Sequence, residues 1–340
     1  MRIHKFESTE AFIAVDLAGA EASSGPVRWA TKILQGGAKD LARSQTYTYA
    51  ALEMRRGGAS AGISAEVDAR AEAVEAFINE VGALVADGTY LPDAAKGIGT
   101  SDLAIVRKDD PRDTARLDAV AARFDSLSAA ITADTTVGLA GRTVAIEGFG
   151  DAGPDLASAV AARNGTVIAV STSAGTVTNS AGIDAAALAE AYAAEGADCV
   201  GRFGEVGHPM AIFGSGAEIT FAGSKTGIVD HTVAAQLAES AALVASGRLA
   251  MTAKALAVLR AADVAAPGDF ISLAGGTIAA WGEATRSDDE VADDITAQIT
   301  DLCSGHNDHA EGPFLAACYA AESFLSTWQD TLPFGRPLAP

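Results

Sequence analysis

Thr143-Val-Ala-Ile-Glu-Gly-Phe-Gly-Asp-Ala-Gly153 is a short apolar segment that ends in three glycines spaced as Gly-x-Gly-x-x-Gly. Gly148 permits a tight turn, Gly150 lets backbone N–H groups approach a pyrophosphate, and Gly153 lets a following helix pack closely on the strand. The N-terminus of that helix would face the phosphate charge. The segment therefore predicts a strand, a glycine-rich turn and a helix of the dinucleotide-binding type.

The residues that follow complete one strand-helix-strand unit. Asp155–Ala162 has the composition of a helix, and Thr166–Ser171 is a second apolar strand at the distance that one βαβ unit requires. Three glycines alone are a weak signal, and this order of elements strengthens it. We therefore predict nucleotide binding; the alternative is a glycine-rich turn that binds no ligand.

Composition limits the classes of protein to consider. The chain has 340 residues, is 49% hydrophobic and carries a net charge of −20, so we expect two domains with their own cores and no nucleic-acid partner. No uninterrupted apolar run reaches the length of about 18 residues that a membrane span needs. The polar first residues do not resemble a signal peptide, and three cysteines give no even disulfide framework. We expect a cytoplasmic protein with reduced thiols.

Alternating strand and helix patterns predict an α/β fold with a parallel sheet. Strands are expected at Ala11–Val15, Glu218–Ala222, Ala242–Ala245 and Asp269–Leu273. Helices are expected over Ala38–Met54 and Thr252–Ala262, and around the apolar stripes from Val74 to Val85 and from Leu117 to Ile131. A glycine-rich loop is expected over Arg55–Gly62.

The order of these motifs resembles the glutamate/leucine/phenylalanine/valine dehydrogenase family over most of the chain. The similar segments are Leu41–Ala51, Gly57–Ile63, Ile98–Asp102, Asp113–Arg116, Val167–Val177 and Leu273–Gly276. The resemblance implies an N-terminal α/β substrate and oligomerisation domain over residues 1–112 and a Rossmann dinucleotide-binding domain over 113–282. It further implies a C-terminal helical segment over 283–340 that packs back on the first domain, and a homo-oligomer.

The chain departs from this family at the residues that perform its chemistry. Oxidative deamination uses one lysine to hold the substrate carboxylate, a second to activate water and an aspartate to move protons. By the resemblance, Thr48 and Ser60 occupy the two lysine positions and Gly97 the aspartate position. A hydroxyl replaces neither the charge nor the acidity of an ammonium group. We therefore predict a substrate other than a standard amino acid.

The expected cofactor is NADP or NAD. The second strand ends in Ser171, Thr172 and Ser173, where NAD-preferring relatives place an acidic residue, so a 2′-phosphate is not repelled and Arg202 is available to assist. The alternative is a neutral loop that binds nothing. By motif and resemblance, the predicted cofactor-binding residues are Thr114, Gly148, Phe149, Gly150, Asp151, Ala152, Gly153, Ser171, Thr172 and Ser173.

The catalytic residues are not identified, and the candidates for the substrate cleft are Thr48, Arg56, Ser60, Lys96 and Asp102. Arg56 either binds an anionic substrate in place of the missing lysines or lies on a solvated loop edge. No metal site is predicted, because Cys303, His306 and His309 match no common zinc spacing.

Three functions stay open. The first is an NAD(P)-dependent oxidoreductase that acts on a carbonyl or hydroxyl substrate. The second is a catalytically silent nucleotide-binding or regulatory homologue, and the third is an amino-acid dehydrogenase whose catalytic groups have moved, with Lys96 supplying an ammonium group.

Overall fold

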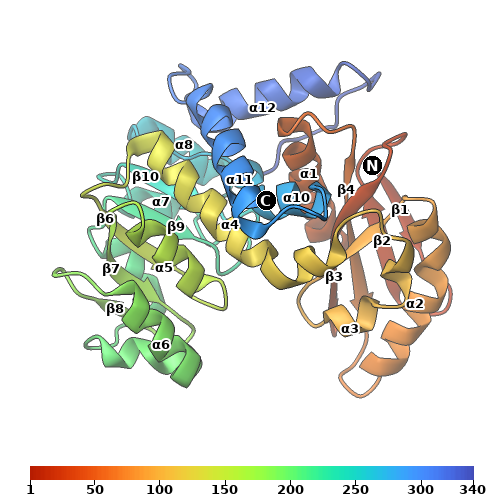
Figure 1. The fold of residues 1–340 in the computed structure, drawn as a ribbon, viewed down its shortest axis with the longest axis horizontal. Helices are drawn as coiled ribbons and strands as arrows, with labels where there is room; N and C mark the ends of the chain where they lie inside the picture. The colour runs from red at the N-terminus through yellow and green to blue at the C-terminus, as the bar shows by residue number, and fades with distance from the viewer. The chain divides into compact units, whose positions relative to one another are not determined.

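A computed structural model describes residues 1–340 and contains two five-stranded sheets, each within its own unit of the chain (Figure 1). The first unit comprises Met1–Ala119, Ala280–Ala284 and Cys318–Pro337, and the second comprises Val120–Ala279, Thr285–Ala317 and Leu338–Pro340. The predicted fold class, two-domain α/β with a Rossmann-type sheet in one domain, is confirmed.

The first unit is built on a mixed sheet with the strand order β1-β2-β4-β3-β5. The strands are β1 (Arg2–Lys5), β2 (Ala11–Val15), β3 (Ser23–Ala30), β4 (Gly57–Ser64) and β5 (Leu91–Ala94). Strand β2 pairs antiparallel with β1 and β4, whereas β3 pairs parallel with β4 and β5. The helices are α1 (Gln35–Ala51), α2 (Arg70–Ala86), α3 (Thr100–Leu103) and the start of α4 (Thr114–Val137), with a 3-10 turn at Val106–Asp109.

Strand β4 corrects the predicted loop over Arg55–Gly62. All eight residues of Gly57–Ser64 are buried, and the strand lies in the middle of the sheet. Its glycines serve close packing rather than a turn. A Cβ on Gly58 would lie 1.9 Å from the carbonyl oxygen of Ala42 in α1, so only glycine lets this helix approach the strand.

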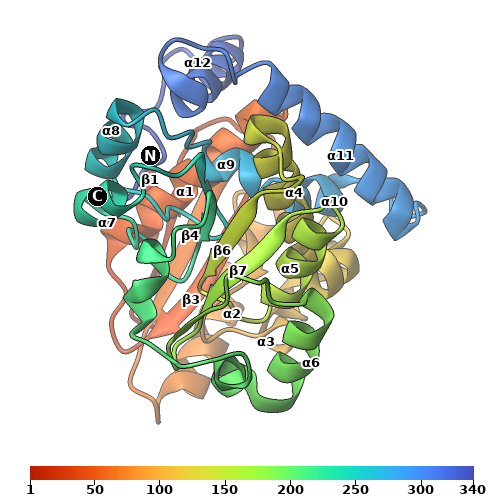
Figure 2. The same cartoon turned by 90° about the vertical axis from the view of Figure 1, so that its left-hand side faces the viewer.

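The second unit contains the predicted parallel sheet, in the order β10-β9-β6-β7-β8. The strands are β6 (Thr143–Glu147), β7 (Thr166–Ser171), β8 (Thr176–Thr178), β9 (Ile219–Ala222) and β10 (Ala242–Ala245). Four strands are parallel, and β8 adds an antiparallel edge to β7. Figure 2 shows β6 and β7 side by side, and the predicted strand positions in this sheet are confirmed up to β10.

Helices of the second unit supply part of the core of this sheet. Those that contribute buried residues are the rest of α4, α5 (Gly153–Ala161) and α6 (Ala185–Glu195). The unit also contains α7 (His231–Gln236), α8 (Ala253–Ala261), α9 (Asp269–Ser272) and α11 (Asp288–Ser304), with 3-10 turns at Gly196–Arg202 and Pro209–Gly214. Helices α10 (Gly275–Trp281) and α12 (Gly312–Leu325) each begin in the second unit and end in the first. Val144, Ile146 and Phe221 of the sheet and Leu156 and Val160 of α5 belong to one buried cluster. None of the helices combines the length and apolar character that a membrane crossing requires.

The strand predicted at Asp269–Leu273 is wrong, because Asp269–Ser272 forms helix α9. The sheet edge beside β10 is already occupied at Ala265, which exchanges backbone hydrogen bonds with Ala241 and Leu243. The chain then turns at Gly268, and the Asp269 carboxylate accepts a hydrogen bond from the backbone N–H of Leu249 at 2.9 Å. Tertiary contacts therefore override the strand propensity of the apolar run.

Candidate functional site

The turn between β6 and α5 carries the glycine motif of the sequence. Gly148 has φ of +78°, in the left-handed region that favours glycine. A Cβ at this position would also lie 2.7 Å from the backbone nitrogen of Ser224, which follows β9. Gly148 thus allows both the turn and the close approach of the neighbouring loop.

The other two glycines have different surroundings. A Cβ on Gly153 would lie 2.6 Å from the ring of Phe149, so this glycine makes room for a neighbouring aromatic side chain. A Cβ on Gly150 would have the carbonyl oxygen of Gly148, at 3.9 Å, as its nearest neighbour. The space before Gly150 is therefore open.

A cavity of about 430 Å³ lies against this turn, at the carboxyl ends of β6, β7 and β9. Six of the predicted cofactor-binding residues line it, namely Gly148, Phe149, Gly150, Ser171, Thr172 and Ser173. Asp151, Ala152 and Gly153 continue the turn without lining the cavity, and Thr114 begins α4 in the first unit. Ligands of open parallel sheets bind at this end of the strands.

Backbone donors are available beside the cavity. The N–H of Phe149 donates to the carbonyl of Ser171, and that of Gly153 donates to the carbonyl of Gly150, each at 2.8 Å. The N–H groups of Gly150, Asp151 and Ala152 make no backbone hydrogen bond in this turn. Adjacent unpaired N–H groups at the start of a helix form a favourable environment for an anion.

The end of β7 offers fewer hydroxyls than the sequence suggests. The Ser171 Oγ accepts a hydrogen bond from the N–H of Gly148 at 3.4 Å, and the Thr172 hydroxyl donates to the carbonyl of Ala197 at 2.7 Å. Both residues are buried, whereas Ser173 is exposed. Arg202 is paired with Glu195 at 2.6 Å and does not line the cavity.

Two charged residues lie in the cavity wall, and sequence reasoning expected one of them, Lys225, near the cofactor edge and missed the other, Glu147. Glu147, the last residue of β6, is buried and accepts hydrogen bonds from the N–H groups of Gly223 at 2.9 Å and Ser224 at 3.1 Å. Lys225 follows directly and is exposed at the cavity. The signal for Glu147 was its position as the last residue of β6, beside the parallel strand β9.

Tyr192 of α6 forms a further part of the wall. Its ring packs edge-on against Phe149 with 5.6 Å between centroids, and its hydroxyl donates to the Asp151 carboxylate at 2.9 Å. Burial and this hydrogen bond raise the pKa of Tyr192, which keeps the hydroxyl protonated as a donor. The carboxylate of Asp151 is thereby held by α6.

Thr48 and Ser60, in the first unit, are both fully buried. The Thr48 hydroxyl donates to the carbonyl of Ser44 within α1 at 3.3 Å, and the Ser60 hydroxyl donates to the carbonyl of Pro26 at 3.2 Å. Neither position carries a charge. These hydroxyls satisfy backbone carbonyls, as buried polar groups generally do.

The segment from Lys96 to Asp102 is held by backbone contacts and one ion pair. Gly97 has φ of +77°, and a Cβ there would lie 2.8 Å from Cε3 of Trp29. Asp102 pairs with Arg70 at 2.6 Å, and Arg70 also donates to the carbonyl of Gly97. Lys96 is exposed. The backbone at position 97 therefore accommodates glycine and disfavours an aspartate.

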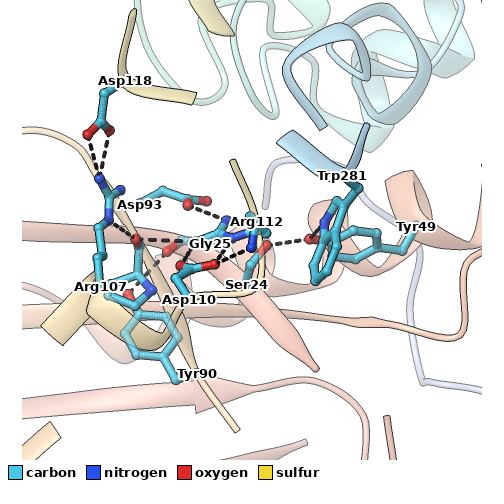
Figure 3. A network of polar contacts seen from close by, with 11 residues as sticks. Ser24, Gly25, Tyr49, Tyr90, Asp93, Arg107, Asp110, Arg112, Asp118 and Trp281 are labelled. Carbon is cyan, nitrogen blue, oxygen red and sulfur yellow. Dashed lines mark hydrogen bonds and ion pairs between the residues drawn. The ribbon is translucent and has the colours of Figure 1, made fainter. Parts of the chain in front are cut away.

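Arg56 lies over the ring of Trp281, with 3.7 Å between the guanidinium carbon and the ring centroid. The indole N–H of Trp281 donates to the Tyr49 hydroxyl at 3.0 Å, and the hydroxyls of Tyr49 and Ser24 share a hydrogen bond of 2.5 Å (Figure 3). Burial raises the pKa of Tyr49, so the phenol stays neutral. The Arg56 guanidinium is therefore placed by stacking and has no carboxylate partner among the ion pairs of the unit.

A buried ion network, also missed from the sequence, lies next to this group (Figure 3). Arg112 pairs with Asp110 at 2.8 Å and with Asp93 at 2.6 Å. Arg107 contacts both carboxylate oxygens of Asp118, at 2.6 and 2.9 Å. These pairs connect the segment before α4 to β5 and fix the start of that helix.

Comparison with models of protein families shows to which family the chain belongs. The model of the Glutamate/Leucine/Phenylalanine/Valine dehydrogenase family matches residues 124–301, just over half of the chain. The chain belongs to this family. The matched range includes the glycine turn and the residues that line the cavity. No curated protein sequence matches the chain.

Solved structures with the same fold include several amino-acid dehydrogenases. A hetero-hexameric glutamate dehydrogenase from Thermus thermophilus, in a Leu-bound form, is 19% identical with a TM-score of 0.77, covering 95% of this chain and 86% of that one. Plasmodium falciparum glutamate dehydrogenase is 13% identical with a TM-score of 0.73, covering 94% and 79%. L-tryptophan dehydrogenase from Nostoc punctiforme is 18% identical with a TM-score of 0.68, covering 96% and 97%. At these identities the likeness shows the shared fold.

Proposed function

We propose that the protein is an NAD(P)-dependent oxidoreductase whose substrate is a carbonyl or hydroxyl compound rather than a standard amino acid. The observation that carries the proposal is the cavity at the carboxyl ends of β6, β7 and β9, with open space before Gly150. Membership of a dehydrogenase family supports the same class of reaction.

The residues of the cavity fit a dinucleotide. Gly150 leaves room for a phosphate to approach the backbone, and the N–H groups of Gly150, Asp151 and Ala152 are the donors that would hold it. The nicotinamide of the bound cofactor supplies the capacity to accept or donate a hydride. The chain's own contribution is to bind and orient this group at the end of the sheet.

The chemistry available at Thr48, Ser60 and Gly97 supports a substrate without an amino group. No ammonium group is present at the first two positions, and a side chain at the third would strain the backbone and clash with Trp29. The lysine and aspartate side chains that would transfer protons in a reaction at an imine carbon are absent from these three positions. Reduction of a carbonyl or oxidation of a hydroxyl does not require a residue that transfers protons to and from a substrate nitrogen.

An anionic substrate is supported by Arg56. A guanidinium stacked on Trp281 keeps its outer N–H groups available for a carboxylate or phosphate, which it binds through two parallel hydrogen bonds. We further propose that the protein forms a homo-oligomer. The Thermus thermophilus structure of the same fold is described as hetero-hexameric.

Calorimetric titration with NADH and NADPH, followed by turnover assays on keto, hydroxy and amino acids, tests the proposal. We expect micromolar binding and turnover of a keto or hydroxy acid, with amino acids inactive. Binding without any turnover would favour the catalytically silent homologue, and oxidation of an amino acid would favour the relocated dehydrogenase. Failure to bind either cofactor would overturn the proposal.

A Ser60→Lys variant tests whether the missing lysine alone prevents amino-acid oxidation. If the lost lysine alone accounts for the missing deamination, the variant gains amino-acid oxidation. We expect no gain, because Thr48 and Gly97 still lack their groups and the new ammonium group would enter a fully buried position. Ser60→Met, which adds similar bulk without charge, is the matched control for folding.

A further inference from the structure

The charges around the dinucleotide cavity are sparse. Glu147 and Lys225 are the only ionisable acidic and basic residues that line it, in a protein with a net charge of −20. A pyrophosphate brings two further negative charges into this wall. Unless a cation faces it, the repulsion from Glu147 and the rest of the molecule opposes binding.

The Glu147 carboxylate is turned toward the loop after β9. Two backbone N–H groups, of Gly223 and Ser224, donate to its Oε2 at 2.9 and 3.1 Å. These hydrogen bonds compensate the buried charge and fix the turn that immediately precedes Lys225. The lysine therefore extends from a rigid base, although its side chain is exposed.

The sheet order places Lys225 on one side of the glycine turn. Strand β6 lies between β7 and β9, so the turn after β6 is flanked by the end of β7 and by the loop after β9. The missing Cβ of Gly148 brings this loop within van der Waals contact of the turn at Ser224. Lys225 thus adjoins the phosphate-binding turn from the side opposite to Ser173.

The ammonium group of Lys225 has no ion-pair partner in the structure. No carboxylate lies within salt-bridge distance, in contrast to Arg142 and Arg202 of the same unit, which pair with Glu218 and Glu195. At the β7 end of the cavity there is no cation, because Arg202 is engaged elsewhere. The cavity therefore has one available positive charge, and it lies beside the glycine turn.

We propose that Lys225 pairs with the pyrophosphate of the bound dinucleotide, and that the site therefore accepts both NADH and NADPH with little discrimination. The inference rests on the proposed function. A charge-assisted contact to the pyrophosphate stabilises both cofactors equally, since they share this group. The 2′-phosphate of NADPH would face the end of β7, where Ser173 offers a hydroxyl and the wall holds neither an attracting nor a repelling charge.

Substitution of Lys225 tests the proposal by calorimetric titration with NADH, NADPH, ADP and adenosine 2′-monophosphate. Lys225→Gln should raise the dissociation constants of NADH, NADPH and ADP by about 10- to 100-fold, while adenosine 2′-monophosphate is unaffected. Lys225→Arg should retain most of the affinity. Lys254→Gln is the matched control, because it removes the same charge at an exposed position of the same unit outside the cavity.

Each outcome separates the inference from the function on which it rests. A common loss for the three pyrophosphate ligands, with lower sensitivity to salt than the wild type, supports the pairing. A loss confined to NADPH and adenosine 2′-monophosphate would overturn it by placing Lys225 at the 2′-phosphate. Unchanged binding in Lys225→Gln would also overturn it, with the proposed function intact. If the wild-type protein bound none of these ligands, the proposed function and the inference would both be wrong.

Discussion

Arg112 and Asp110 form an ion pair in which both partners are withdrawn from solvent. Their side chains are 2% and 0% exposed, and Nη2 of the arginine lies 2.8 Å from Oδ2 of the aspartate (Figure 3). Arg112 also pairs with the more exposed Asp93. The two carboxylates together compensate the guanidinium, so loss of the arginine would leave a buried negative charge without a partner.

The first prediction concerns this pair. Arg112→Met should lower the free energy of unfolding by about 3–5 kcal/mol, because the Asp110 carboxylate would remain buried and unpaired. Urea denaturation followed by circular dichroism measures the change. Arg202→Met, at an exposed pair with Glu195, should leave the midpoint nearly unchanged. A loss for Arg112→Met as small as that of the control would show that Asp110 is hydrated in solution.

The second prediction separates the roles of the three glycines. Gly150→Ala should fold with wild-type stability, because its methyl group meets only open space, and should weaken NADH binding about tenfold or more by occupying that space. Gly148→Ala and Gly153→Ala should each cost about 1–3 kcal/mol of stability through backbone strain or collision with Phe149. Thermal unfolding and calorimetric titration provide the two readouts. Equal effects of all three on stability would contradict the assignment.

The sequence predicted the second unit well because its signals are local. The apolar segments that form β6 and β7 lie close to a glycine-rich turn in the sequence. Thr252 is a typical N-cap residue, and its side chain caps the first turn of α8. The loop predicted over Arg55–Gly62 and the strand predicted over Asp269–Leu273 were wrong, because the structure of both segments depends on distant partners. The first is a strand because α1 packs on its glycines, and the second is a helix because Ala265 already pairs with β10.

The role of Glu147 could not be found from local pattern for the same reason. Glu147 acts through hydrogen bonds to residues 76 and 77 positions away, and nothing in its own neighbourhood predicts that partner. The Trp281 indole reaches Tyr49 across 232 positions. The hydroxyls of Ser171 and Thr172 could be read from the sequence, but their hydrogen-bond partners could not. In the structure the N–H of Gly148 donates to Ser171 and the hydroxyl of Thr172 donates to the carbonyl of Ala197.

The third prediction tests whether position 97 can carry an aspartate. Gly97→Asp should fail to create amino-acid dehydrogenase activity and should lower stability by about 2 kcal/mol or more, because φ is +77° and the Cβ would meet the Trp29 ring. Gly97→Ala should be destabilised to a similar extent, which isolates the backbone and Cβ effects from the charge. Gly99→Ala is the matched control, since no atom lies within 3.4 Å of its Cβ and its φ is −92°.

Stable folding of Gly97→Asp would contradict this account. It would mean that the segment between β5 and α3 can change its backbone conformation to admit a side chain. The measurement is the midpoint of urea denaturation. The slope of the transition is compared as well, to exclude a change in the surface exposed on unfolding. Arg70 makes such a change costly. Its guanidinium donates two hydrogen bonds to the Gly97 carbonyl, at 3.0 and 2.7 Å, and is held in turn by Asp102.

Cys303 gives the fourth prediction, through a buried thiol in α11. Its side chain is almost completely enclosed, and burial raises the pKa of the thiol to about 11 despite a hydrogen bond with Thr132. In the unfolded chain the thiol ionises near pH 8.5. Above that pH the unfolded state releases its proton first, so stability falls as pH rises toward the folded pKa.

The free energy of unfolding should therefore decrease between pH 8.5 and 11 by about 2 kcal/mol more in the wild type than in Cys303→Ala. The alanine variant has a constant cavity cost at every pH, so the difference between the two proteins isolates the titration of this thiol from that of the buried tyrosines, which both proteins share. Urea denaturation at a series of pH values under reducing conditions measures it. Parallel stability curves for the two proteins would mean that the native thiol ionises as readily as the unfolded one. Rapid alkylation of Cys303 in the native protein at pH 9 would lead to the same conclusion by an independent route.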